Sequence, residues 1–316
     1  MVEELDVPHV FVMMATYNGE KYVSEQIESI LAQTNVNITL LISDDGSTDR
    51  TIEICKHYTQ NSNVQLQINK KNKGLALNFM NMVYHADSLK FDYFAFSDQD
   101  DYWLPNKLEK AINCIQGFPS DEAILYYSDI FNVDSNLKDP EPEYRCFKNI
   151  ANQLKPLLTC NYASGCTMVF NAKLCRLLQE RPINEFPRIH DVWVHLVAIT
   201  CGRVLPDLDH SYIYRRITGE NQVGKRNFGD FSIAVFVKLL KGLKKESKHE
   251  LTRTAKLLYK LYKNDMDEMS RVTVEHFIAY QATWLGRLKL ALDPGYKVAT
   301  LSDTLLIKLR LLSGRC

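Results

Sequence analysis

Three carboxylates lie within four residues at Asp98, Asp100 and Asp101, directly after the apolar run Phe94–Phe96. An apolar, aromatic run of this kind is typical of a buried strand, so the acids are expected where that strand leaves its sheet. Carboxylates held this close repel one another unless a cation lies between them. Oxygen ligands suit Mg²⁺ or Mn²⁺, and these ions suit a phosphate-bearing ligand. Taken alone, the stretch fits a metal site and an acidic, solvated loop equally well.

Two earlier segments repeat this arrangement of polar residues after an apolar run. Thr16–Asn18 follows His9–Ala15, and Asp44–Asp45 follows the run Val36–Ser43. Stretches with apolar residues at helical spacing separate these runs. Strands that alternate with helices of about a dozen residues predict an α/β fold, with a mostly parallel sheet covered by helices on both faces. Because ligands bind beyond the carboxyl ends of such strands, the polar segments are expected to face one crevice.

The regular alternation of predicted strands and helices ends after about residue 129. Residues 134–156 are polar and interrupted by three prolines, which predicts a long excursion between regular elements. Gly165–Phe170 and Ser211–Arg216 are predicted strands, and His190–Thr200 is a predicted apolar helix.

The charge distribution divides the chain into an acidic body and a basic end. Residues 1–223 hold 20 basic and 29 acidic residues, whereas residues 224–316 hold 18 basic and 9 acidic residues. From Phe231 the chain is predicted to be all-helical, with apolar and Lys-rich faces that suit an anionic membrane surface. The alternative is a solvated helical face packed on the body. We therefore predict a domain over residues 1–224 and a helical extension over residues 225–316 that contacts a membrane or a second copy of the chain.

The cysteines and the N-terminal residues indicate the cellular compartment in which the protein is expected. The eight cysteines form no C-x-x-C pair and are expected to be reduced thiols of a cytoplasmic protein. No basic segment followed by an apolar one opens the chain, so no secretory signal is expected. No apolar run reaches the roughly 18 residues of a spanning helix. A nucleic-acid partner is not expected.

Five motifs, in this order and spacing, resemble the inverting family 2 glycosyltransferases, which bind nucleotide sugars with a GT-A fold. The motifs are Met14–Gly19, Ile42–Asp49, Phe96–Pro105, Ser164–Thr167 and His190–Trp193. The segment from Tyr214–Arg216 to Asn221–Gly224 resembles bacterial rhamnosyltransferase-like members, although many of those continue Tyr-Arg-Gln-His where this chain has Tyr214-Arg215-Arg216-Ile217. The resemblance covers about residues 9–224. It implies a GT-A-type sheet followed by a C-terminal all-helical extension.

The resemblance also implies a donor site and a metal site. The residues expected to contact the donor are Thr16, Tyr17, Asn18, Asp45, Asp98, Gln99, Arg215 and Arg216. Among them, Asp45 matches the acid that accepts a hydrogen bond from the nucleotide base, a role that suits an ionised carboxylate because it only accepts. Turn formation is the alternative role for Asp45, and a surface salt bridge is the alternative for the two arginines. Asp98, Asp100 and Asp101 are the implied Mg²⁺ or Mn²⁺ ligands, with Asp100 as the direct ligand and Asp98 near the ribose.

Asp191 matches the catalytic base of the family. An inverting transfer needs one carboxylate within hydrogen-bond reach of the attacking hydroxyl. The alternative is a helix N-terminal acid that the helix dipole favours, and the two roles are compatible. His190 and Trp193 are implied acceptor contacts, with a structural histidine and core packing as the alternatives.

The sequence therefore predicts a metal-dependent inverting glycosyltransferase. It is expected to move a sugar from a nucleoside diphosphate to a lipid-linked or polysaccharide acceptor in cell-surface glycan synthesis, at the cytoplasmic face of a membrane. dTDP-rhamnose is the favoured donor, and a UDP-hexose is the alternative. A sugar-phosphate nucleotidyltransferase would carry a glycine-rich, basic signature where Thr16–Gly19 lies. An inactive nucleotide-sugar-binding subunit would have lost one of Asp98, Asp100 and Asp191, and all three are present.

Overall fold

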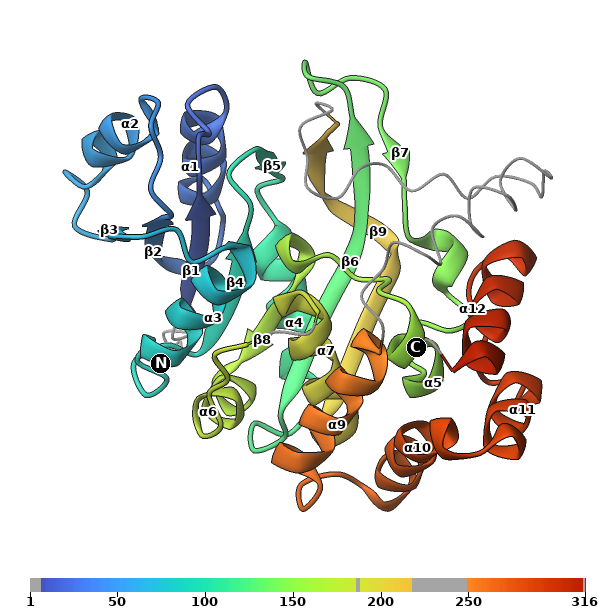
Figure 1. The fold of residues 1–316 in the computed structure, drawn as a ribbon. Helices are drawn as coiled ribbons and strands as arrows, with labels where there is room; N and C mark the ends of the chain where they lie inside the picture. Colours follow the sequence, from blue (N-terminus) through green and yellow to red (C-terminus); the bar gives the residue numbers. More distant parts are fainter. Residues whose placement is uncertain (1–6, 186–187, 218–248, 315) are drawn as a thin grey trace.

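The computed structural model describes residues 7–185, 188–217, 249–314 and 316, and its centre is a single mixed sheet (Figure 1). The strands follow the order β3-β2-β1-β4-β8-β6-β9-β5, and β7 pairs with β6 at its far end. Their bounds are β1 His9–Thr16, β2 Asn37–Asp44, β3 Val64–Ile68, β4 Tyr93–Ser97, β5 Asp101–Trp103, β6 Ile124–Val133, β7 Glu141–Pro142, β8 Val169–Asn171 and β9 Arg203–Arg216.

The first half of the sheet is parallel, as the alternation of strands and helices predicts. β1 pairs in parallel with both β2 and β4, and β2 pairs in parallel with β3. In this register Thr16 lies opposite Asp44, so the predicted alignment of the strand ends is confirmed. The chain order reverses at β1, whose neighbours come later in the sequence on both sides, and this is where α/β sheets bind ligands.

The second half of the sheet mixes directions. β8 runs antiparallel to β4 and β6, while β6 and β9 are parallel. The predicted strand Gly165–Phe170 is in fact a 3₁₀ turn over Gly165–Thr167 followed by the short β8. β5, which the sequence did not predict, pairs antiparallel with β9 and places Asp101 opposite Arg215.

Helices cover the sheet. Their bounds are α1 Val23–Leu31, α2 Thr51–Tyr58, α3 Leu75–His85, α4 Lys107–Gln116, α5 Leu154–Thr159, α6 Ala172–Gln179, α7 His190–Cys201, α9 Glu250–Tyr262, α10 Glu268–Ala279, α11 Trp284–Leu292 and α12 Leu301–Ser313. In Figure 1, α3, α6 and α7 lie together in front of the sheet and α4 lies behind it. β1 is buried along almost its whole length because helices cover both of its faces, which explains its unbroken apolar sequence.

The helices after residue 249 pack on the sheet domain and share its hydrophobic core. Leu258 and Tyr262 of α9 are fully buried, and the Tyr262 ring lies 6.0 Å from that of Trp193 on α7. The apolar side of α9 is therefore covered by protein, as in the alternative of a helical face packed on the body, and membrane contact of the extension stays a prediction. The predicted loop at 218–224, the predicted helix from Phe231 and the predicted domain boundary lie outside the described residues, so the division into two domains stays a prediction. No helix within the described parts of the chain has both the length and the apolar character needed to cross a bilayer.

His195 of α7 is a buried histidine without a hydrogen bond. Its ring is 0% exposed, lies between Tyr127 and Tyr162 with centroids 5.1 and 5.3 Å away, and neither ring nitrogen has a partner. Burial, assisted by the charge of Arg188, lowers the pKa of His195 to about 3. The native state therefore holds this imidazole neutral, whereas the unfolded chain takes up a proton near pH 6.5.

Replacing His195 with Leu is expected to make the protein more resistant to acid. The stability that His195 contributes as a neutral group is present above the unfolded pKa of about 6.5, and it is lost as the pH falls from there toward about 3. The free energy of unfolding of the wild type should thus fall relative to that of His195→Leu by about 1.4 kcal/mol per pH unit in this window. Urea unfolding at several pH values measures the difference, and the exposed His57→Gln serves as control. A difference that does not change with pH would contradict the expectation.

Candidate active site

A cavity of about 370 Å³ opens beyond the carboxyl ends of β1, β2 and β4. It brings together ten of the thirteen predicted site residues, which are Thr16, Tyr17, Asp45, Asp98, Gln99, Asp100, Asp101, His190, Asp191 and Arg215. Asn72, Gly74, Asn78, Ser164 and Gly165 also line it, and Ser164 and Gly165 belong to one of the five motifs. Asn18, Arg216 and Trp193 are not among its lining residues. Segments that are far apart in the sequence thus meet in one crevice, as the strand ends predict.

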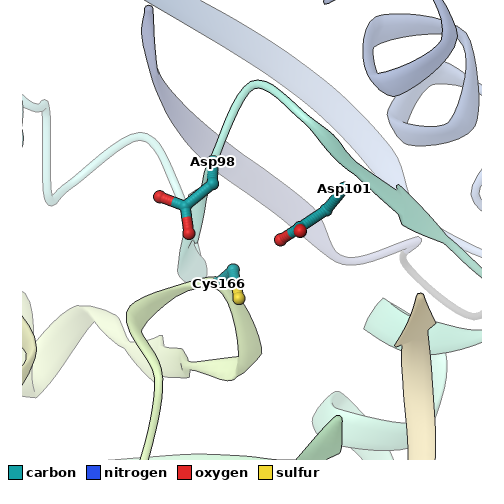
Figure 2. A group of neighbouring side chains, drawn as sticks. All are labelled: Asp98, Asp101 and Cys166. Carbon is teal, nitrogen blue, oxygen red and sulfur yellow. The ribbon is translucent and has the colours of Figure 1, made fainter. Parts of the chain in front are cut away.

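Asp98 and Asp101 lie on the two sides of the turn between β4 and β5, and Cys166 lies close to both (Figure 2). Ligand atoms of the three side chains lie within 4.8 Å of one another. Asp101 is buried, and neither of its carboxylate oxygens has a hydrogen-bond partner. Burial, followed by the charges of Asp100 and Asp191, raises the pKa of Asp98 to about 7. Burial and the charges of Asp98 and Asp100 also raise the pKa of Asp101 well above its usual range.

This cluster fits a hard divalent cation. Two buried, unpaired oxygens on Asp101 and a second carboxylate within reach are oxygen donors of the kind that Mg²⁺ and Mn²⁺ prefer. Burial raises the pKa of the Cys166 thiol well above its ordinary value, so this sulfur stays protonated and is a poor ligand for either ion. Asp98 and Asp101 are the residues that would hold the ion, with Asp100 lining the same cavity.

Arg216 binds the backbone of the turn that carries Asp100 and Asp101. Its Nη1 donates to the carbonyl oxygens of Asp100 at 3.0 Å and of Asp101 at 3.2 Å, and its Nη2 pairs with Glu25. The side chain is buried and also lies over the ring of Tyr22. Arg216 therefore positions the backbone of the acids instead of reaching the donor site, which corrects its predicted contact with the donor.

Arg215 points to the other side of β9 and does line the cavity. Its guanidinium donates to Asn132 Oδ1 at 2.7 and 3.0 Å and pairs with Glu143. Glu143 comes from the segment that the sequence analysis treated only as an excursion. Held by these two partners, the Arg215 charge acts on the acid cluster and offsets part of the rise in the pKa of Asp98.

Asp44 and Asp45 have different surroundings at the end of β2. Asp44 is fully used in the turn, since it accepts hydrogen bonds from the amides of Gly46 and Ser47 and from the hydroxyl of Thr16. Asp45 lines the cavity and accepts from the amides of Lys73 and Gly74 just before α3, at 2.8–3.0 Å. Gly74 has a φ of 77°, a conformation that glycine adopts without strain, and this lets its amide face Asp45.

Gln99 and Asn18 fix the loops at the cavity mouth. The Gln99 amide pairs with the Tyr17 backbone, accepting from its N–H at 2.9 Å and donating to its C=O at 3.0 Å. Asn18 is not among the residues that line the cavity. Its Oδ1 accepts from the backbone N–H of Thr48 at 2.8 Å, and its own backbone N–H donates to Ser47 Oγ at 2.9 Å. Asn18 thus joins the loops after β1 and β2, and its contact with the donor stays a prediction.

Asp191 lies in the first turn of α7 with its carboxylate at the cavity. Its Oδ2 accepts a hydrogen bond from Asn161 Nδ2 at 3.1 Å, and its Oδ1 accepts from the Val192 amide at 2.6 Å. The helix N-terminus favours the ionised form of the side chain. The sequence analysis missed Asn161 because a single asparagine outside any motif carries no signal of its own.

His190 lines the cavity next to Asp191, whereas Trp193 does not. The His190 ring stacks on Phe79 at a centroid distance of 4.2 Å, and burial lowers its pKa to about 3, so the imidazole is neutral. A Cβ at Gly165 would lie 2.7 Å from His190 Nε2, so only glycine lets the two elements approach this closely. Trp193 is buried against Tyr262, and core packing is therefore the role that the fold gives it.

Comparisons with known proteins agree with this geometry. The family described as Glycosyl transferase family 2 matches residues 11–177. The dTDP-rhamnosyl transferase RfbG of Shigella flexneri is 32% identical over 191 residues, which are 58% of this chain and 62% of that protein. The chain therefore spans less than two thirds of the length of this relative.

Solved structures share the fold at low sequence identity. Crystal structures of S. aureus TarS 1-349 in complex with UDP give a TM-score of 0.56 at 16% identity, over 96% of this chain and 90% of that one. The mannosyltransferase PcManGT of Pyrobaculum calidifontis, in complex with GDP-Man and Mn²⁺, gives 0.51 at 14% identity, over 98% and 87% of the two chains. These likenesses confirm the predicted α/β architecture of the GT-A kind with a helical C-terminal region.

Proposed function

The chain belongs to glycosyltransferase family 2, and on that premise we propose that it transfers a sugar, with inversion, from a nucleoside diphosphate to an acceptor hydroxyl. The observation that carries the proposal is the single cavity that holds both the acid cluster of Asp98 and Asp101 and the helix-borne carboxylate of Asp191. An inactive subunit that only binds a nucleotide sugar would not need both the acid cluster and the carboxylate of Asp191.

The two ends of the cavity have separate roles in this proposal. Thr16, Tyr17 and Asp45 line the end that takes the base and ribose. Asp45 already accepts from the amides of Lys73 and Gly74 and from Asn69 Nδ2, so a base N–H would share one of its oxygens with these donors. Arg215 faces the diphosphate with its positive charge. When bound by Asp98 and Asp101, a divalent ion supplies positive charge to the leaving diphosphate.

Asp191 acts as the general base in the transfer. Its carboxylate takes the proton of the acceptor hydroxyl while that oxygen attacks C1 of the sugar. The bond between C1 and the diphosphate oxygen breaks in the same step, and the nucleoside diphosphate leaves. Asn161 and the Val192 amide orient the base through Oδ2 and Oδ1, and the acceptor hydroxyl approaches the carboxylate from the cavity. His190, neutral and next to Asp191, contributes to the acceptor side of the cavity.

The donor we favour is dTDP-rhamnose. The partial similarity to a dTDP-rhamnosyl transferase supports it, as does the rhamnosyltransferase-like segment after Tyr214. A UDP-hexose is the second candidate, since a neighbour of the same fold was solved with UDP. The acceptor we propose is a lipid-linked or polysaccharide glycan of the cell surface, reached from the cytoplasmic face of a membrane.

A donor panel tests the proposed function. The protein is incubated with dTDP-rhamnose, UDP-glucose, UDP-galactose or GDP-mannose, with Mg²⁺ or Mn²⁺, and with a lipid-linked glycan extract as acceptor. Chromatography should show metal-dependent release of one nucleoside diphosphate that increases on addition of the acceptor. Release from none of the donors would contradict transferase activity, and release from a UDP-hexose alone would replace rhamnose as the sugar.

Replacing Asn161 with Ala is expected to lower kcat by about ten- to a hundredfold with little change in the KM of the donor. A hydrogen bond to a charged group contributes about 1.5–3 kcal/mol, and this one orients the base and not the donor. Steady-state kinetics measures the two constants separately. A higher donor KM with unchanged kcat would show that Asn161 serves donor binding instead, and Asn149→Ala, on the preceding loop, provides the control.

A further inference from the structure

Apolar side chains gather on the C-terminal helices. Of the large hydrophobic residues exposed in the described chain, eight of thirteen lie between residues 269 and 312. Trp284 and Leu292 of α11 are 65% and 70% exposed, and Leu301 of α12 is 84% exposed. Isolated exposed apolar residues are ordinary, but a concentration of them marks an interaction surface.

These residues form a stripe along each helix. On α12 the exposed Leu301, Leu305 and Leu312 recur at helical spacing on one side, whereas Ile307 and Leu311 are buried on the other. On α11 the exposed residues are Trp284, Leu285 and Leu292. We call these six side chains the α11–α12 face.

The two helices are fixed to each other. Lys308 Nζ of α12 donates to the carbonyl oxygens of Ala291 at 2.7 Å and Asp293 at 3.3 Å, at the end of α11. Figure 1 places both helices at the outer edge of the molecule, on the far side of α5 and α9 from the parallel strands. The two helices that carry the face are therefore joined to each other at one edge of the fold (Figure 1).

The charge around this face is positive. Residues 284–312 contain five basic and two acidic residues. Both acids are engaged within the protein, since Asp293 pairs with Lys155 at 2.7 Å and Asp303 accepts from Thr300 Oγ1 at 2.7 Å. Lys289 of α11 and Lys297, in the connection between α11 and α12, are both exposed.

We propose that the α11–α12 face docks on a bilayer that contains anionic phospholipid. Tryptophan and leucine enter the interfacial layer of a bilayer, and lysines beside them reach the negative headgroups. Two copies of this face would bring like charges together, so charge complementarity favours the anionic bilayer over self-association. Docking extends the proposed function, because a lipid-linked acceptor lies in the same bilayer, but it is measured without donor or acceptor.

Vesicle co-sedimentation tests this proposal with the full chain. Phosphatidylcholine vesicles with and without phosphatidylglycerol are mixed with the wild type, with the triple variant Trp284→Gln, Leu292→Gln, Leu301→Gln, and with Lys289→Glu, Lys297→Glu. The control is Leu89→Gln, which replaces an equally exposed leucine outside the face. Because all of these side chains are exposed, the variants should fold, and release of nucleoside diphosphate without a lipid acceptor should stay at the wild-type level.

The wild type and Leu89→Gln are expected to sediment with the anionic vesicles, less so at high salt, while the triple variant and the charge variant bind at least about tenfold more weakly. Absence of wild-type binding would overturn the proposal, and so would equal binding by the triple variant. A wild-type dimer that the triple variant abolishes, without vesicle binding, would overturn it in favour of a second copy. Vesicle binding without donor turnover would instead contradict the proposed function alone.

Discussion

Replacing Asp191 with Asn is expected to lower the transfer rate by about 10²- to 10⁴-fold and to leave donor affinity unchanged. The amide has nearly the shape of the carboxylate, so the first turn of α7 and the contact with Asn161 are kept in place. What is lost is the basic oxygen that takes the proton of the acceptor hydroxyl. Rate measurements at saturating donor, together with calorimetric titration of the donor, separate the two effects.

The control for this variant is Asp209→Asn, an exposed acid that pairs with Lys148 and does not line the cavity. It should behave like the wild type in both measurements. Transfer by Asp191→Asn at a rate close to that of the wild type would show that another group is the base. A parallel loss of donor binding would show that Asp191 serves the donor site.

Replacing Asp101 with Asn is expected to stabilise the metal-free protein and to abolish its response to metal. At neutral pH the unfolded chain carries the Asp101 charge in water, whereas in the fold this carboxyl is buried against Asp98, which raises its pKa, so the charge opposes folding. Removing that charge should raise the free energy of unfolding by on the order of 1 kcal/mol, a rise of about 2–4 °C in Tm. The wild type should gain stability when Mg²⁺ or Mn²⁺ is added with a nucleoside diphosphate, and the variant should not.

Two further variants define the ligand set in the same thermal-shift assay. Asp100→Asn should also lose the response to metal, with a smaller gain in metal-free stability because Asp100 is less buried than Asp101. Cys166→Ala should keep the response, because a protonated thiol does not hold these ions. Loss of the response in Cys166→Ala with retention in Asp101→Asn would replace the carboxylate site with a thiolate site for a softer metal.

The part of the site that the sequence predicts well is local. Apolar runs that end in Thr16, Asp45 and Asp98 mark strand ends, and the parallel pairing of β1 with β2 and β4 brings those ends together. The acids, the base and Arg215 follow from their places in the motifs. Short-range pattern and the rule for parallel sheets are enough for this much of the cavity.

The part that the sequence does not predict depends on contacts between distant segments. Arg216 reaches the carbonyl groups of Asp100 and Asp101 only because β5 pairs with β9, and this pairing leaves no periodic signal in three residues. Either Arg215 or Arg216 could have been the one that faces the cavity, since successive residues of a strand point to opposite faces. Asn161 and Glu143 reach the site from segments without a motif.

The C-terminal helices show a similar limit. Periodicity identifies an apolar side on α9 and on α12, but it does not say which side the body will cover. The fold covers that of α9, through Leu258 and Tyr262, and leaves Leu301 and Leu305 of α12 exposed. Within the extension that was predicted to contact a membrane, the contact is therefore proposed for α11 and α12 and not for α9.

The central claim is that one cavity binds a nucleoside diphosphate through a divalent ion held by Asp98 and Asp101. Calorimetric titration of the wild-type protein with dTDP and with UDP, in Mn²⁺ and in EDTA, tests it most directly. The account predicts saturable binding of at least one of them in Mn²⁺, no binding in EDTA, retention of binding by Asp191→Asn and loss of binding by Asp101→Asn. Binding that is the same in EDTA as in Mn²⁺, or that survives in Asp101→Asn, would contradict it.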